Sequence, residues 1–154
     1  MKRISALAIA AGLCLMGCGA DDSVSPTPDS AAQWVGEFTG TAFYLLPNGS
    51  TGESEKGKAT LSIKAVDPKR ISLVAQVAYI PVGSTKEAVA SAAAIVVSPP
   101  ADSLQAESRS GSSRNEFVIT KNGTELRADI VTSERNFDGG WNLTQRLVMT
   151  LTRK

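Results

Sequence analysis

The chain contains no histidine and only two cysteines among its 154 residues. Histidine is the commonest general acid or base near neutral pH and the commonest zinc ligand. Its absence excludes Ser-His-Asp and Cys-His catalysis, and it also excludes metal sites built on imidazole. We therefore expect a protein that is not an enzyme and that uses no cofactor and no metal.

The chain also has no excess of charge of either sign, and it has few aromatic side chains. The 16 lysines and arginines nearly balance the 15 aspartates and glutamates, and aromatic residues make up 5% of the chain. Nucleic-acid binding requires clustered basic residues, and no such cluster occurs in the sequence. The composition predicts no nucleic-acid partner, and it supplies few rings to line a deep ligand cavity.

One apolar run stands out, and it lies close to the first residue. Lys2 and Arg3 precede the apolar stretch from Ala6 to Leu15. Ten residues of helix span about 15 Å, roughly half of a bilayer's hydrocarbon core, so the run is too short to be a transmembrane anchor. A positive segment followed by a short apolar segment is typical of a secretory signal peptide, here residues 1–17.

The end of this run resembles the lipobox of bacterial lipoproteins. Its residues are Leu15, Met16, Gly17 and Cys18. The resemblance implies cleavage between Gly17 and Cys18 and a diacylglycerol on the Cys18 sulfur. The alternative is an ordinary signal peptide in which Cys18 is incidental, but no clean Ala-x-Ala cleavage site is present. Cys14 would be discarded with the signal peptide, leaving no partner for a disulfide.

The resemblance also implies a location. Two or three acyl chains on Cys18 would make membrane attachment effectively permanent, because one chain alone binds only marginally. An Asp directly after the cysteine can retain such proteins in the inner membrane, and Gly19 stands there instead. We expect a lipid-anchored protein of the cell envelope, at the outer membrane. Asp21 and Asp22 loosely resemble surface-export signals, with a plain solvated linker as the alternative.

Residues 18–32 are small, polar and interrupted by prolines. Such a segment cannot bury enough apolar area to order itself. It predicts a flexible tether between the lipidated cysteine and a β domain at residues 33–154.

The rest of the chain alternates apolar and polar residues with a period of two, which predicts strands. The turn pairs Asn48-Gly49 and Asn122-Gly123 separate such runs. The predicted strands cover 34–44, 59–66, 71–79, 104–108, 116–120, 126–132 and 141–153. Strands joined by local turns predict an all-β fold, an antiparallel meander that forms a small β-barrel or a strongly curled sheet. Closure would remove the exposed sheet edges.

Residues 84–98 leave two alternatives open. Ser84 and Glu87 match the S-x-x-E capping box that opens a helix, and an alanine-rich stretch follows them. This pattern favours a short helix and then a short strand. The alternative is a strand that ends before Pro99 and Pro100.

The predicted barrel is similar to lipocalins in one respect. Lipocalins have a Trp in the first strand, and a basic residue near the end of the last strand packs across it. Here Trp34 opens the first predicted strand, and Arg153 and Lys154 close the last. The chain departs from the lipocalin Gly-x-Trp pattern, since Gly36 follows Trp34 instead of preceding it.

The remaining candidates for chemistry are carboxylates and apolar sets. Glu37 and Asp129 alternate with apolar neighbours, which predicts that both face away from the core. The apolar sets either pack in the core, which we favour, or line a pocket, so no ligand-binding residue is assigned. These sets are Trp34/Phe38, Leu61/Ile63, Ile71/Leu73 and Trp141/Leu143/Leu147.

Together these observations predict a membrane-anchored bacterial lipoprotein with a non-enzymatic binding or interaction domain. Its expected partners are the membrane, through the lipid on Cys18, and either an envelope protein or a small apolar ligand. The alternative function is a lipocalin-like carrier of a small apolar ligand.

Overall fold

The computed structural model describes residues 31–81 and 83–154. The signal peptide, the cleavage site at Gly17 and Cys18, and the tether up to residue 30 lie outside the described residues. The described part forms nine strands and no helix. These are β1 (Gly36–Leu45), β2 (Thr51–Glu53), β3 (Ala59–Asp67), β4 (Arg70–Tyr79), β5 (Ala88–Val97), β6 (Ser103–Ser110), β7 (Ser113–Asn122), β8 (Glu125–Arg135) and β9 (Trp141–Arg153).

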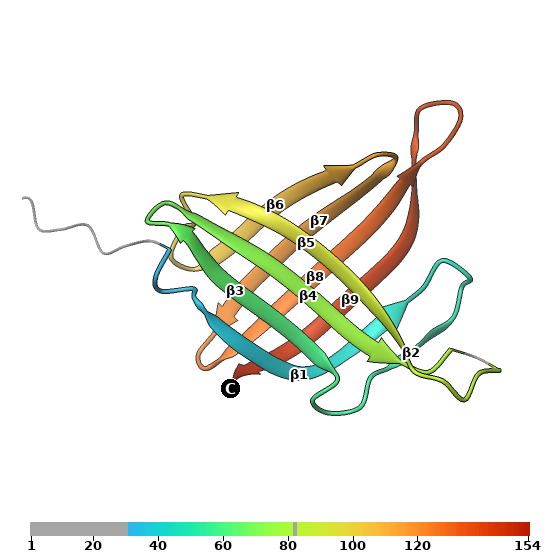
Figure 1. Cartoon of the computed structure of the whole chain (residues 1–154), viewed down its shortest axis with the longest axis horizontal. Helices are drawn as coiled ribbons and strands as arrows, with labels where there is room; N and C mark the ends of the chain where they lie inside the picture. The colour runs from blue at the N-terminus through green and yellow to red at the C-terminus, as the bar shows by residue number, and fades with distance from the viewer. Residues whose placement is uncertain (1–30, 82) are drawn as a thin grey trace, which may run out of the picture.

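The strands form one antiparallel sheet in the order β5-β4-β3-β1-β9-β8-β7-β6, and β2 pairs with β1. The first and last strands pair directly, with Ala42 opposite Met149. The sheet curls until β5 and β6, its two ends, lie next to each other. The result is a nearly closed barrel (Figure 1), which confirms the predicted all-β antiparallel meander. No helix in the described part of the chain is long and apolar enough to span a membrane.

Alternation along the strands explains how the chain fills the barrel. In β4 the buried Ile71, Leu73, Ala75 and Val77 point inward and the residues between them point outward. The other long strands contribute inward side chains in the same way, and together these form one continuous core. The largest side chains that are completely buried are Trp34, Phe117, Leu61, Ile63, Ile71, Leu73, Leu104, Ile119, Ile130, Leu147, Met149 and Leu151. These residues make the interior a packed core.

The favoured helix after Ser84 is wrong. The Ser84 hydroxyl accepts a hydrogen bond from the Lys86 amide (3.0 Å), which closes a local turn. Glu87 forms an ion pair with Lys58 on another segment (2.5 Å) and does not cap a helix. Strand β5 begins at Ala88 and pairs with β4 along its whole length. A helix in this place would leave the other edge of β4 without a partner, so sheet pairing overrides the local signal.

Strand β1 begins at Gly36, two residues later than predicted. Trp34 lies in the turn that precedes it, where its amide bonds to the Ala31 carbonyl (3.1 Å). The ring is nevertheless completely buried. Trp34 therefore closes one end of the barrel from a turn and is not part of the wall.

The short strand β2 lies inside a region expected to be a loop. It exists because β1 changes partner at Gly40. Up to Gly40, β1 pairs with β3, and beyond it β1 pairs with β2. A Cβ atom at Gly40 would lie 1.9 Å from the Thr150 carbonyl oxygen, so only glycine fits here. Ser54 completes the new pairing because its buried hydroxyl accepts a hydrogen bond from the Ala42 amide (2.8 Å).

Candidate functional site

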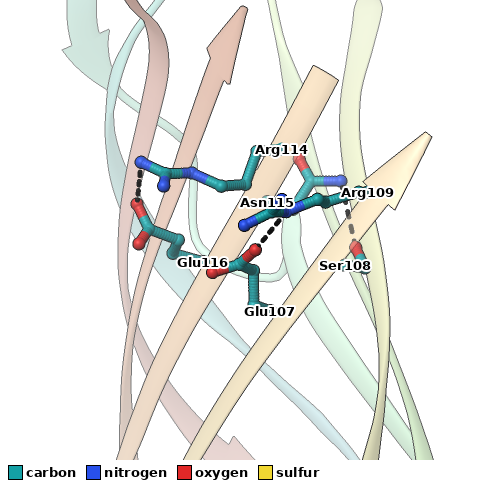
Figure 2. A network of polar contacts seen from close by, with 6 residues as sticks. All are labelled: Glu107, Ser108, Arg109, Arg114, Asn115 and Glu116. Carbon is teal, nitrogen blue, oxygen red and sulfur yellow. Dashed lines mark hydrogen bonds and ion pairs between the residues drawn. The ribbon is translucent and has the colours of Figure 1, made fainter. Parts of the chain in front are cut away.

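The barrel has a discontinuity between β5 and β6, which we call the seam. The two strands are consecutive in the chain and neighbours in space, yet no backbone ladder joins them. Among the described residues, the one hydrogen bond across the seam runs from the Ser108 hydroxyl to the Ala93 carbonyl (2.6 Å). The Asn115 side chain on β7 in turn donates to the Ser108 hydroxyl (3.4 Å), as Figure 2 shows. A side-chain contact therefore takes the place of a ladder.

The segment that connects β5 to β6 explains why no tight hairpin forms. It contains Pro99 and Pro100, which have fixed φ angles and no amide hydrogen. Ser98 before them has φ 49°, which is uncommon for a residue other than glycine. The Trp34 indole N–H donates to the Pro100 carbonyl (2.7 Å) and ties this connector to the barrel end. The connector is thus stiff and tied to the barrel end, and it does not form a tight hairpin turn.

The unpaired backbone groups of β5 can be identified residue by residue. Hydrogen-bonding direction alternates along a strand. Because the Ala93 carbonyl points into the seam, the amides and carbonyls of Val89, Ser91, Ile95 and Val97 point there as well. None of these groups bonds to the β6 backbone in the described chain. In Figure 1 the two strands also separate toward the turn between β6 and β7, where the start of β5 is left free.

The side chains flanking the seam differ sharply between its two strands. Strand β5 carries no charged residue, and Val89, Ile95 and Val97 are more than half exposed on its outer face. Strand β6 carries Glu107 and Arg109 on its outer face, joined by an ion pair of 2.5 Å (Figure 2). Charged side chains protect a sheet edge against pairing with another chain. The β6 edge is protected in this way and the β5 edge is not.

The barrel end closed by Trp34 differs in detail from the lipocalin-like expectation. The cation over the Trp34 ring is Lys121 from β7, whose Nζ lies 3.9 Å from the ring centroid. Arg153 lies over Phe38 instead, at 5.5 Å, and donates to the Val35 carbonyl (2.6 Å). The prediction that the last strand supplies the residue across Trp34 is therefore wrong. Burial is the largest cause that lowers the pKa of Lys121. The charge of Asp102 raises this pKa, and the charge of Arg153 lowers it.

The two candidate carboxylates lie outside the barrel, as predicted. Glu37 accepts a hydrogen bond from the Ser62 hydroxyl (2.6 Å). Asp129 holds a two-pronged contact with Arg146, with distances of 3.1 and 2.7 Å. Each carboxylate is thus engaged with its own neighbour on the outer surface. The described residues contain no group of three or more Asp, Glu, His or Cys side chains placed to hold a metal ion.

The predicted apolar sets divide between the core and the outer surface. Leu147 is buried as expected, whereas Leu143 is half exposed. Trp141 lies on the outer face between Arg109 and Arg114, whose guanidinium carbons are 5.8 and 4.7 Å from its ring centroid. The cause is a register shift in the β8–β9 pairing, where Thr144 is an extra residue. The shift turns the start of β9 over, and alternation alone gives no sign of it.

No family model, no curated protein and no solved structure matches this chain.

Proposed function

We propose that this protein is a bacterial lipoprotein of the cell envelope, anchored by lipid on Cys18. Its β domain is a non-enzymatic interaction module that binds an extended segment of a partner polypeptide along the edge of β5. The lipobox-like residues Leu15 to Cys18 support the anchor. The unprotected edge of β5 carries the proposal of an interaction module.

The backbone groups exposed at the seam favour a partner polypeptide in extended conformation. An exposed strand edge presents amides and carbonyls at the spacing that another extended backbone matches, and strand addition is a common mode of peptide recognition. The groups of Val89 and Ser91 are free to accept such a partner. The uncharged outer face of β5, with Ile95 and Val97, favours a segment with apolar side chains.

The packed interior weighs against the alternative of a lipocalin-like carrier. A carrier requires a cavity inside the barrel, usually several hundred Å³. Here large side chains such as Phe117, Ile130 and Met149 are completely buried at its centre. Small alanines on β5, among them Ala90 and Ala92, face inward opposite them. We therefore favour recognition on the outer surface.

The anchor is tested by exchanging each cysteine separately. We expect Cys18→Ala to abolish incorporation of labelled palmitate and to release the protein from the membrane fraction. Cys14→Ala is the matched control, because Cys14 lies within the segment that is removed, and it should leave both properties unchanged. Lipid labelling of the Cys18→Ala variant would disprove the anchor.

The interaction edge is tested with a photo-crosslinking amino acid in living cells. We expect one discrete adduct from position 89 on β5 and none from position 118 on β7. Position 118 is the control, because Val118 is an apolar residue about as exposed as Val89. Introducing Ser91→Pro should abolish the adduct, because proline removes an amide hydrogen that points into the seam. Equal adducts from both positions, or none from 89, would refute the proposal. An adduct of twice the chain's mass would identify a second copy as the occupant and would also overturn it.

A further inference from the structure

A second feature of the barrel has no role in the proposed interaction at the seam. A pocket of about 240 Å³ opens at the end closed by Trp34, between the turn before β1 and the hairpin that joins β7 to β8. Trp34, Phe38 and Leu126 form its apolar wall, and Lys121 and Arg153 bring two positive charges to it. We call it the end pocket.

Neither cation of the end pocket forms an ion pair within 4.0 Å with a described residue, and the negative charge that acts on Lys121 is that of Asp102, at a longer distance. Lys121 lies over Trp34, and Arg153 lies over Phe38 with one guanidinium nitrogen on the Val35 carbonyl. Every ion pair within 4.0 Å among the described residues involves other side chains. Glu125 also lines the pocket but reaches neither cation at this distance.

Closure of the barrel end does not require this arrangement. An apolar side chain over Trp34 would cover the ring without placing a charge beside Arg153. Burial is the main cause that lowers the pKa of Lys121; the charge of Asp102 raises this pKa in part, and the repulsion from Arg153 lowers it further. A negative group bound between the two cations would remove the repulsion and replace the lost hydration.

We propose that the end pocket binds a small amphipathic anion, a carboxylate that carries a short aromatic or aliphatic body. The carboxylate would lie between Lys121 and Arg153, and the body would lie against Phe38 and Leu126, beside the Lys121 stem that covers the buried Trp34 ring. The modest volume favours a body of about ten non-hydrogen atoms over a long acyl chain. This inference does not depend on the anchor or on the seam.

The test uses phenylacetate as the probe and the indole N–H signals of the purified full-length chain as the readout. The chain has two tryptophans, Trp34 in the end pocket and Trp141 on the outer surface at the opposite end. We expect phenylacetate to shift the Trp34 signal in a saturable way and to leave the Trp141 signal unchanged. Phenylacetamide, which has the same shape without the charge, should bind at least tenfold more weakly.

Three variants show which side chains carry the charge recognition. Lys121→Met keeps an apolar stem over Trp34 and should weaken phenylacetate binding at least tenfold, whereas Lys64→Met, outside the pocket, should have no effect. Glu125→Gln removes the repelling carboxylate and should tighten binding severalfold. Equal binding of the acid and the amide by the unmodified chain would overturn the proposal without relying on any variant. So would absence of saturation, or equal shifts of both indole signals. Unchanged phenylacetate binding by Ser91→Pro would separate this site from the seam.

Discussion

Two neighbouring residues of β5 provide a stringent test of the seam, because the geometry predicts opposite consequences for one and the same substitution. The Ser91 amide points into the seam and has no backbone partner there, whereas the Ala92 amide points toward β4. Proline at either position removes one amide hydrogen. We expect Ser91→Pro to be tolerated and Ala92→Pro to be strongly destabilising.

The size of each change in the free energy of unfolding follows from what the lost amide contacts. Ala92 lies opposite Ala75, which is completely buried, so proline at 92 leaves a buried acceptor on β4 without its hydrogen bond. An unsatisfied buried group costs about 1–3 kcal/mol, and the proline ring adds steric strain within the sheet. The melting temperature should fall by about 5–15 °C. Ser91→Pro should change the free energy of unfolding by less than about 1 kcal/mol, because a solvated amide is lost at an exposed edge.

Urea unfolding followed by tryptophan fluorescence measures both effects, because Trp34 is buried in the folded chain. Amide hydrogen exchange gives an independent readout in the unmodified protein. We expect slow exchange at Ala90, Ala92 and Ala94 and fast exchange at Val89 and Ser91, an alternation that only an open edge produces. Equal destabilisation by the two prolines, or uniform protection along β5, would show that β5 and β6 are paired and would refute the reasoning.

Three further predictions concern other parts of the barrel. Trp34→Phe should lower the free energy of unfolding in urea by about 2–4 kcal/mol, since it removes the hydrogen bond to Pro100 and leaves space at a buried site. Trp141→Phe, on the outer surface, should cost less than half as much. Gly40→Ala should cost about 3 kcal/mol or prevent folding, because its Cβ would overlap the Thr150 carbonyl, and circular dichroism with thermal melting measures this. The third prediction concerns pH. Because folding lowers the pKa of Lys121, the unfolded state binds more protons between that lowered pKa and the ordinary lysine value of 10.5. Stability should therefore rise with pH in this window relative to Lys121→Met, and a flat difference between the two proteins would contradict the assignment.

Local pattern predicts much of this barrel because most strands have one polar and one apolar face. Ile71 to Val77 in β4 alternate cleanly, and the length of β9 from Trp141 to Arg153 matches its prediction. Strand β5 is different, because both of its faces are small or apolar, and its alanines fit a helix as well as a strand. Pairing with β4 decides between these conformations, and such a long-range contact leaves no mark in a local window.

The parts of the candidate sites that could not be predicted all depend on chain segments meeting across the barrel. Trp34 is recognisable as a candidate, but Lys121 reaches it only because the β7–β8 hairpin lies at the same end. Ser108 is only the last residue of a predicted strand, and nothing in the sequence marks it until the curl of the sheet brings it to Ala93. Thr144 is indistinguishable from any strand threonine, yet as an inserted residue it moves Trp141 outward.

The charges beside the seam support the proposal that the β5 edge is a site of recognition. An open edge invites pairing with other chains, and a single charged side chain is enough to discourage it. Ala93 and Ile95 both point outward, so a lysine at either position would not disturb the core. The opposite edge carries such protection in Glu107 and Arg109. An edge that remains uncharged over ten residues, beside one that is charged, is open to the strand addition that we propose.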